Sequence, residues 1–462
     1  MVNKYLALLI AALTTAEVQA STLVPRLIVN INIDEWRGEY FDSFLPLFQE
    51  DGLKKLSREG HVFDVASAPF DFVNAPAAIT TIATGTTPFY HGIIGAQWLD
   101  RSTLHPMRCT EDKRYTYAPS NVKCSTVGDE LKIVTHGKSI VYSLAAHADY
   151  AILSAGHTAD NAIWYDKRYR RWNTTTYYGA SPQWLNTPLA PSTITNIDIG
   201  NKAIDIVNQE RMGKDDIPDL LTITLSAALD DNESLRQQDQ AEQLIYQQID
   251  QTIAKLVTSI EQSVGKAHVL FVITGTGTSD ESENDYSLYR VPTGNFYINR
   301  TAKLLNVYLS ALYGQGTYVD ATWGNQIYLD RKTIEQKHLR LQDVLVQSQS
   351  LLFQTAGVSD VYTCEQLFAN NAAVSRVRNA FHPNLSGDLV IKVAPGWKMI
   401  NEDSQESYTS RAAVAHFPII FYGNGVTQTH DFTPITTDYI APTLCKSIRI
   451  RAPNACATSP LF

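Results

Sequence analysis

Three short segments of the sequence carry groups that can bind a metal ion or an anion. Asp34 ends one apolar run, Asp230 and Glu233 follow another, and a turn rich in glycine and threonine at 274–278 follows a third. A carboxylate at the carboxyl end of a parallel strand projects into the crevice where ligands bind. Carboxylates coordinate cations such as Ca²⁺, and such turns present N–H groups to anions. The alternative for each is a capping carboxylate or a solvated loop.

The runs that lead into these segments predict the strands of a mainly parallel sheet. The first covers 27–33, and similar runs cover 139–144, 220–225 and 268–274. Nearly continuous apolar runs are typical of strands that are covered on both faces. Helical periodicity lies between them, most clearly at 241–260. Its apolar stripe consists of Leu244, Ile245, Ile249, Ile253, Leu256, Val257 and Ile260. Strands alternating with helices predict an α/β layered fold.

The pattern changes at about residue 290. Helix-like segments at 301–312 and 339–354 flank a strand-like run at 324–329. We interpret the region from about 290 to 385 as an inserted cap or subdomain. The central sheet is expected to resume at 389–393.

The first twenty residues have the pattern of a signal peptide. Lys4 provides the positive charge, an apolar stretch follows, and Val18-Gln19-Ala20 fits a small-x-small cleavage site. No later stretch approaches 18 uninterrupted apolar residues, so we expect no transmembrane segment in the mature chain. Residues 1–20 are therefore predicted to direct export, with 21–462 as the mature domain in the periplasm or cell envelope.

Composition limits the partners and the redox chemistry. The formal charge of −9 and the pI near 5.7 argue against a nucleic-acid partner, because there is no basic surplus to displace counterions. In an oxidising compartment Cys109–Cys124 and Cys445–Cys456 are plausible disulfides, with Cys364 left over. The alternative is that all five cysteines are free and buried.

Many segments, in order along almost the whole mature chain, resemble the type I phosphodiesterase and nucleotide pyrophosphatase branch of the alkaline phosphatase superfamily. The segments that carry the resemblance are 33–40, 81–88, 91–95, 126–131, 155–157, 164–166, 382–383, 386–388, 395–397, 416–423 and 437–444. The resemblance implies an alkaline-phosphatase-like three-layer sandwich with a central, mainly parallel sheet and an inserted cap.

The resemblance also implies a chemistry. In this family two zinc ions, held by Asp and His, clamp a phosphoryl group that a Thr or Ser hydroxyl attacks. Asp34 matches the first metal ligand and is the only ligand retained in register.

The nucleophile and the phosphate-contacting amide are both missing. Ala75 falls at the nucleophile position and Ala96 at the asparagine position. An alanine methyl group has neither a proton to lose nor a lone pair. Thr80 and Thr81 lie nearby; one of them replaces the nucleophile, or both are ordinary residues of the helix.

The other ligand positions have lost the side chains that bind zinc. They are occupied by Leu229, Thr276, Gly277 and Ser407. A shift of one residue brings Asp230 to a ligand position, and Glu233 can bind a hard cation through oxygen. These two residues form either a replacement carboxylate site or a solvated acidic loop.

The sequence therefore leaves three functions open. The first is an exported pseudoenzyme without a cofactor, which binds a protein partner in the periplasm or at the cell surface. The second is a phosphatase or phosphodiesterase whose rebuilt site uses Asp34, Asp230 and Glu233 with zinc or another divalent cation. In the third, the old crevice binds a ligand without turning it over.

Overall fold

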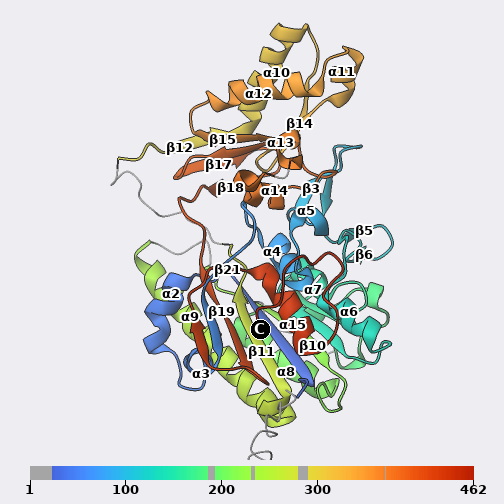
Figure 1. Ribbon diagram of the computed structural model, residues 1–462, viewed down its shortest axis with the longest axis vertical. Helices are drawn as coiled ribbons and strands as arrows, with labels where there is room; N and C mark the ends of the chain where they lie inside the picture. Colours follow the sequence, from blue (N-terminus) through green and yellow to red (C-terminus); the bar gives the residue numbers. More distant parts are fainter. Residues whose placement is uncertain (1–22, 186–192, 230–234, 279–289, 370) are drawn as a thin grey trace, which may run out of the picture.

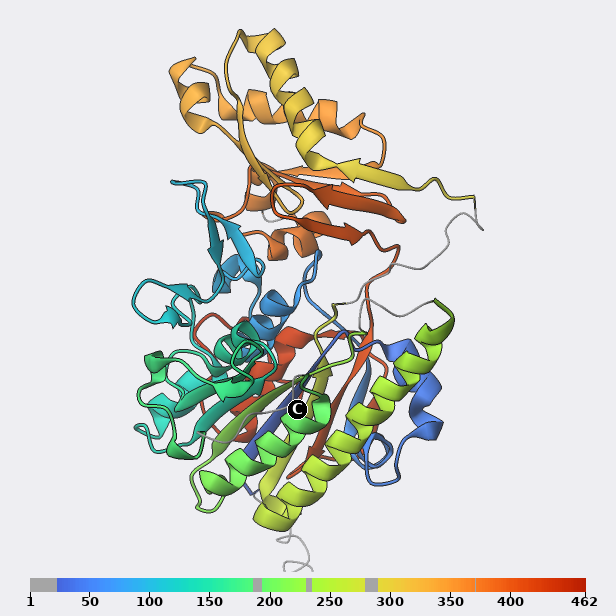
Figure 2. The same cartoon turned by 180° about the vertical axis from the view of Figure 1, so that it is seen from behind.

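The computed structural model describes residues 23–185, 193–229, 235–278, 290–369 and 371–462. The predicted signal peptide lies outside these ranges. The chain forms a large unit around one sheet and a smaller unit, the cap (294–409), at one end of it (Figures 1 and 2). The chain enters the cap after the sheet strand that ends at Gly275 and returns to the sheet at Phe417.

The described part of the large unit contains a ten-stranded sheet in the order β20-β2-β19-β11-β1-β10-β7-β8-β9, with β21 beside β2. Strands β11, β1, β10, β7 and β8 are parallel, whereas β19 and β9 run antiparallel to their neighbours. The strands are β1 (Leu27–Asp34), β2 (His61–Ser67), β7 (Val141–Ala145), β8 (Asn161–Asp166), β9 (Arg171–Asn173), β10 (Asp219–Ser226), β11 (Val269–Gly275), β19 (Phe417–Gly423), β20 (Thr429–Asp431) and β21 (Ile435–Thr436). The predicted mainly parallel sheet is confirmed.

Helices cover both faces of this sheet, which explains the apolar strands. Helices α2 (Gly38–Phe44), α3 (Leu53–Glu59), α8 (Asn196–Gln209) and α9 (Leu235–Val264) share one hydrophobic core with the sheet. Helices α4 (Ala75–Thr84), α6 (Val127–Val134), α7 (Ala148–Ala155) and α15 (Ile440–Ser447) share the core on the opposite face. All eight residues of β1, at the centre, are buried.

One residue of the predicted α9 stripe lies on the wrong face. Leu244 is 65% exposed, whereas Tyr246, two residues later, is 2% exposed and packs in the core. Residues two positions apart point in nearly opposite directions on a helix. The buried stripe thus continues through Tyr246.

The cap contains two small sheets and its own hydrophobic core. One sheet has the order β12 (Gly294–Tyr297), β17 (Trp397–Asn401), β18 (Glu406–Thr409). The other has the order β13 (Val319–Trp323), β14 (Gln326–Leu329), β16 (Leu389–Val393), β15 (Val358–Thr363). Helices α10 (Ile298–Tyr313) and α12 (Leu341–Phe353) pack on these sheets.

The prediction that the central sheet resumes at 389–393 was wrong. Strand β16 occupies these residues and pairs antiparallel with β14 and β15 inside the cap. The chain returns to the central sheet only at β19, so the cap extends beyond the predicted end near residue 385. A five-residue apolar run predicts a buried strand but not the sheet that the strand joins.

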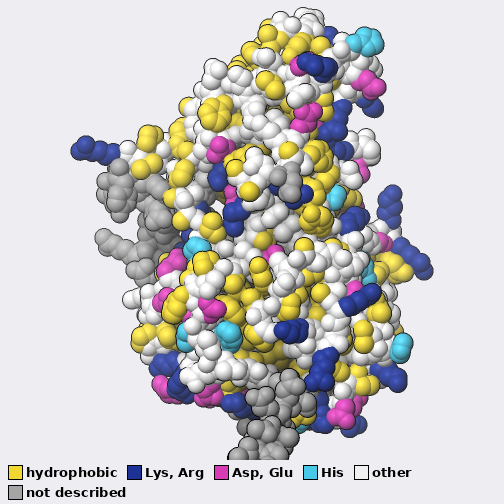
Figure 3. All heavy atoms as spheres, viewed as in Figure 1, with side chains coloured by type: hydrophobic (Ala, Val, Ile, Leu, Met, Phe, Trp, Pro, Cys, Tyr) yellow, Lys and Arg dark blue, Asp and Glu magenta, His cyan; other side chains and the backbone are white. Residues whose placement is uncertain are grey.

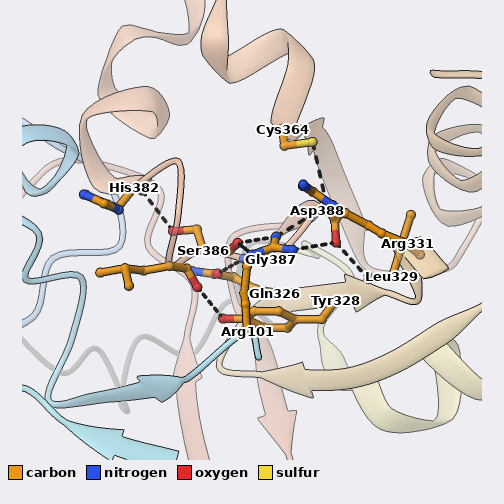
Figure 4. Close-up of polar contacts among 11 residues, drawn as sticks. Arg101, Gln326, Tyr328, Leu329, Arg331, Cys364, His382, Ser386, Gly387 and Asp388 are labelled. Atoms are coloured by element: carbon orange, nitrogen blue, oxygen red, sulfur yellow. Dashed lines mark hydrogen bonds and ion pairs between the residues drawn. The ribbon is translucent and has the colours of Figure 1, made fainter. Parts of the chain in front are cut away.

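A buried carboxylate in the cap helps to hold the two units together. Asp388 is fully buried and contacts Arg331, whose Nε lies 2.9 Å from Oδ1, and Arg101, 3.4 Å away. Arg101 lies in the turn between β3 (Gln97–Leu99) and β4 (Pro106–Arg108) of the large unit. Its guanidinium group also donates to the carbonyl of Ser386 (Figure 4). The Ser386-Gly387-Asp388 segment therefore joins the cap to the β3–β4 hairpin.

Basic and acidic side chains are interspersed over the face of the molecule shown in Figure 3. None of the helices in the described ranges has the length and hydropathy needed to cross a bilayer.

Candidate functional site

A cleft of about 590 Å³ lies between the large unit and the cap. Its lining includes three of the positions singled out from the sequence, Ala96, Gly277 and Ser407. Glu35 and Thr278, next to the ends of β1 and β11, also line it. The cleft therefore opens at the edge of the sheet where Asp34 was expected.

Asp34 is only 7% exposed and accepts hydrogen bonds from three hydroxyl groups. The hydroxyls of Thr276 and Thr278 lie 2.8 and 2.5 Å from Oδ1. The hydroxyl of Tyr150 lies 3.2 Å from Oδ2. These donors come from the turn after β11 and from α7, on either side of β1 in the fold.

Backbone N–H groups orient the two threonine hydroxyls toward Asp34. Thr276 Oγ1 accepts from the N–H of Thr278 at 3.3 Å, and Thr278 Oγ1 accepts from the N–H of Glu35 at 3.2 Å. The two hydroxyl oxygens also lie 2.6 Å from each other, so both hydroxyls and the carboxylate belong to one hydrogen-bond network. Glu35 has a φ of 58°, in the left-handed region that non-glycine residues rarely occupy.

Tyr150 remains a donor over the whole physiological pH range. Burial, followed by the nearby charge of Asp34, raises the pKa of its phenol well above the usual value. The ring of His147 lies 5.1 Å from that of Tyr150, and burial lowers the pKa of its imidazole. Asp34 is therefore surrounded by neutral donors.

The described surroundings of Asp34 do not fit a zinc ion. Zinc sites use thiolate, imidazole and carboxylate ligands, whereas Asp34 contacts protonated hydroxyls. Within the described ranges, no group of three or more His, Cys, Asp or Glu side chains is arranged to hold a metal ion. Asp230 and Glu233 lie outside the described residues.

Ala75, at the nucleophile position, is the first residue of α4 and is 6% exposed. Its methyl group belongs to a hydrophobic cluster that includes Ile79 and Ile93. Asn74, the preceding residue, caps the helix by accepting from the N–H of Ala77 at 3.1 Å. Asn74 also lines the cleft, so a side-chain amide lies at the N-terminus of this helix.

Thr80 and Thr81 are fully buried inside α4 and cannot replace the nucleophile. Thr80 Oγ1 donates to the carbonyl of Pro76 at 2.8 Å. Thr81 Oγ1 lies 3.1 Å from Nε2 of His91. The Nδ1 atom of His91 accepts from the N–H of Ile93 at 3.1 Å, so Nε2 carries the proton and donates to Thr81.

The remaining predicted positions are distributed over both units. Ala96 is exposed, and its carbonyl accepts from the N–H of Cys109 at 2.9 Å. Leu229 is half-buried just after β10. Ser407 is exposed on β18 of the cap, so it forms part of the wall of the cleft and not of the group around Asp34.

The structure contains neither of the predicted disulfides, because all five cysteines are free. Cys109 and Cys124 are buried in one hydrophobic cluster, and burial raises the pKa of the Cys124 thiol to about 12. Burial also raises the pKa of Cys445. The cysteines are therefore free, as in the alternative, and all but the half-buried Cys456 are buried.

In the lining of the cleft, two cationic side chains of the cap contact one carboxylate of the large unit. Arg376 Nε lies 2.8 Å from Oδ1 of Asp71, and Lys392 Nζ lies 3.2 Å from Oδ2. All three residues line the cleft. These three side chains together carry one net positive charge, and the rest of the lining adds Arg411, Glu35 and Glu406.

Sequence reasoning missed Tyr150 and Thr278. The Thr-Gly-Thr-Gly-Thr pattern at 274–278 contained a signal for Thr278, because it places a second hydroxyl only two residues after Thr276 in the same turn. Nothing in the local sequence of α7 indicated that Tyr150 reaches Asp34, since this contact depends on how α7 packs against the sheet.

The model of the family described as type I phosphodiesterase / nucleotide pyrophosphatase matches residues 28–416. Alkaline phosphatase PafA from Elizabethkingia meningoseptica is 24% identical over 95% of this chain and 94% of its own length. Alkaline phosphatase PhoV from Synechococcus elongatus is 32% identical, but over only 35% of this chain and 32% of its own length.

Solved structures share the fold. The crystal structure of wild-type alkaline phosphatase PafA is similar with a TM-score of 0.81 and 23% identity, covering 95% of this chain and 98% of that one. Murine ectonucleotide pyrophosphatase / phosphodiesterase 5 gives a TM-score of 0.57 at 11% identity, covering 93% and 96%. At these identities the likeness shows the architecture, and the chemistry has to be argued from the site.

Proposed function

This chain belongs to the type I phosphodiesterase / nucleotide pyrophosphatase family of the alkaline phosphatase superfamily. Within that family, we propose that it is a non-catalytic member. It acts as a binding or assembly component of the cell envelope, where it engages a protein partner without hydrolysing a phosphate ester. The proposal concerns the mature chain after export.

The observation that carries this proposal is the set of hydroxyl donors around Asp34. Its oxygens accept from Thr276, Thr278 and Tyr150. Two of these donors lie on Oδ1 and one lies on Oδ2, so a metal ion that binds through Oδ1 has to displace a hydroxyl group. Hydrogen bonds to a charged carboxylate each contribute roughly 1.5–3 kcal/mol. The network therefore stabilises the metal-free arrangement.

The nucleophile position supports the same proposal. Ala75 has no group that can attack phosphorus, and the buried hydroxyls of Thr80 and Thr81 are bonded to the carbonyl of Pro76 and to His91. Covalent phosphoryl transfer needs a nucleophile that can be deprotonated.

The alternative function is a metal-dependent phosphatase or phosphodiesterase with a rebuilt carboxylate site. It is favoured by the alkaline phosphatase activity in the names of the relatives and by the acidic pair Asp230 and Glu233. Such a site would use Asp34 together with that pair to hold zinc or another divalent cation.

One experiment separates the two functions. Purified mature protein is equilibrated with zinc, desalted and analysed for bound metal, and hydrolysis of nitrophenyl phosphate monoesters and diesters is measured beside alkaline phosphatase PafA. We expect substoichiometric zinc and no hydrolysis above background. Stoichiometric zinc with activity that disappears in Asp34→Ala and Glu233→Gln would establish the enzyme instead.

Export is proposed separately from the pattern of residues 1–20. The expected product in the envelope fraction begins at Ser21, after the Val18-Gln19-Ala20 site. Intact-mass measurement of the protein recovered from that fraction checks the cleavage, and an uncleaved cytoplasmic product contradicts it.

A further inference from the structure

Strand β18 is the edge of the three-stranded cap sheet. The sheet order is β12-β17-β18, so within the described residues β18 pairs only with β17. The N–H of Ser410, just after the strand, donates to the carbonyl of Trp397 at 3.0 Å. In antiparallel pairs, residues alternate between bonding the neighbouring strand and pointing away from it. Ser407 and Thr409 therefore direct their N–H and C=O groups away from β17.

This edge forms one wall of the cleft. Every residue of 406–415 is part of the cleft lining, so the chain borders the cleft along all of β18 and beyond it. The volume of about 590 Å³ lies within the roughly 300–1,000 Å³ of ligand pockets in proteins. An exposed strand edge beside such a space is a template for pairing with another extended chain.

The charges at one end of the edge favour an anionic group. Ser410 Oγ donates to the carbonyl of Val393 at 2.8 Å, which brings this end of the edge beside Lys392. Lys392 and Arg376 share the single carboxylate of Asp71, and their side chains are 36% and 33% exposed. An acidic group of a ligand that reaches this place would be a second anionic partner for these two cations.

Apolar side chains of both units also line the cleft. Phe72 and Val73 come from the large unit and Trp323 from β13 of the cap, and Trp323 is held by donating from Nε1 to the carbonyl of Gln97 at 3.1 Å. In strand addition, main-chain hydrogen bonds give affinity and the pockets for alternate side chains give specificity. The cleft combines an unpaired strand edge, apolar side chains and a cationic end.

We propose that the cleft binds an extended segment of a partner protein as an added strand along β18, with an acidic side chain or terminal carboxylate of that segment beside Lys392 and Arg376. This inference rests on the proposed non-catalytic function, because it assigns the kind of partner. A small carboxylate alone does not satisfy the site, since it leaves the N–H and C=O groups of Ser407 and Thr409 unpaired.

Fluorescein-labelled hexapeptides test the proposal by fluorescence polarisation. The probes are Thr-Val-Thr-Val-Thr-Asp and Val-Thr-Val-Thr-Val-Asp with free carboxyl termini, which cover both side-chain registers. We expect saturable binding of at least one. N-methylation of its alternate residues, which removes outward N–H donors, should weaken binding by about tenfold or more, since two net hydrogen bonds of roughly 1 kcal/mol each are lost.

Matched variants locate the peptide on β18. Ser407→Pro removes an outward N–H group and should weaken binding, whereas Ser407→Ala keeps that group and should bind as the wild type does. Lys392→Gln should weaken binding of the acidic peptide but not of its Asn-amide counterpart. Thermal unfolding of each variant shows whether it is folded, and the N-methylated peptides test the backbone pairing without changing the protein.

Three outcomes would overturn the proposal. They are no saturable binding of either hexapeptide, equal binding of the N-methylated form, and competition by free aspartate at the same concentration as by the hexapeptide. These outcomes are measured separately from zinc binding and ester hydrolysis. If the protein binds no zinc, hydrolyses no ester and binds neither peptide, only the strand-addition proposal is overturned.

Discussion

At the scale of single residues, the central feature is a carboxylate whose partners are hydroxyl groups. The sequence predicted Asp34 at the carboxyl end of a strand and Thr276 at another of the family's ligand positions, and the structure brings the two within 2.8 Å. The sequence could not predict the contacts that depend on how the helices pack against the sheet. Tyr150 approaches from α7, and its contact with Asp34 follows from helix packing.

The hydroxyl donors around Asp34 should contribute measurably to stability. Thr276→Val removes one donor from a fully buried position and leaves the carboxylate less well satisfied. We expect the free energy of unfolding to fall by about 2 kcal/mol. Thr80→Val is the matched control, because Thr80 is equally buried but donates only to a helix carbonyl. Chemical denaturation measures both, and equal losses would contradict a special contribution from the pair with Asp34.

His91 should make the protein less stable in mild acid. Burial lowers the pKa of His91 from 6.5 to about 3. Between these values the unfolded chain binds more protons than the folded chain, so the free energy of unfolding falls as the pH falls. The contribution is fully present above the unfolded pKa and decreases by up to about 1.4 kcal/mol per pH unit below it.

The measurement compares urea unfolding of the wild type with that of His91→Gln from pH 7 to pH 5. The glutamine variant lacks the buried imidazole and should lose less stability over this interval. Parallel pH profiles for the two proteins would show that His91 is not the group responsible.

At the scale of elements, helix α9 shows which part of an apolar pattern is buried. Ile253 is fully buried, whereas Leu244 is 65% exposed. Ile253→Ala should lower the free energy of unfolding by about 3 kcal/mol through loss of burial and a residual cavity. Leu244→Ala on the same helix should change it by less than about 0.5 kcal/mol. Thermal unfolding of both variants checks the assignment, and a large loss for Leu244→Ala would contradict it.

The sequence predicted the type of most elements but not all of their partners. The central parallel strands were recognisable because burial on both faces leaves nearly continuous apolar runs. Strand β16 has the same kind of run, yet it joins the cap sheet. Its partners β14 and β15 are set by the three-dimensional course of the inserted segment, which a run of apolar residues does not encode.

At the scale of the whole molecule, the relation of the cap to the large unit depends on a few charged contacts. Asp388 is fully buried between Arg101 and Arg331, and Arg376 of the cap pairs with Asp71 of the large unit. Both contacts lie beside segments that line the cleft. The width of the cleft is therefore fixed by side chains that belong to both units.

Removing the buried carboxylate should loosen this arrangement. Asp388→Asn leaves Arg101 and Arg331 without their shared charge, and we expect a loss of about 3 kcal/mol. Faster proteolysis between the units should accompany it. Asp343→Asn is the control, because Asp343 pairs with Arg340 at the surface, where such pairs contribute roughly 0–1 kcal/mol. Equal effects of the two substitutions would contradict the assignment.

The strand order of the large sheet also has a consequence for folding during synthesis of the chain. Strand β2, near the beginning of the chain, is joined to the centre of the sheet only through β19, which follows the cap. On the ribosome, β2 therefore has to remain unpaired with its neighbour until almost the entire chain has been synthesised. Such long-range pairing slows folding and leaves apolar strand edges exposed in the meantime. The insertion that forms the cleft thus makes the nascent chain dependent on protection until its last strands arrive.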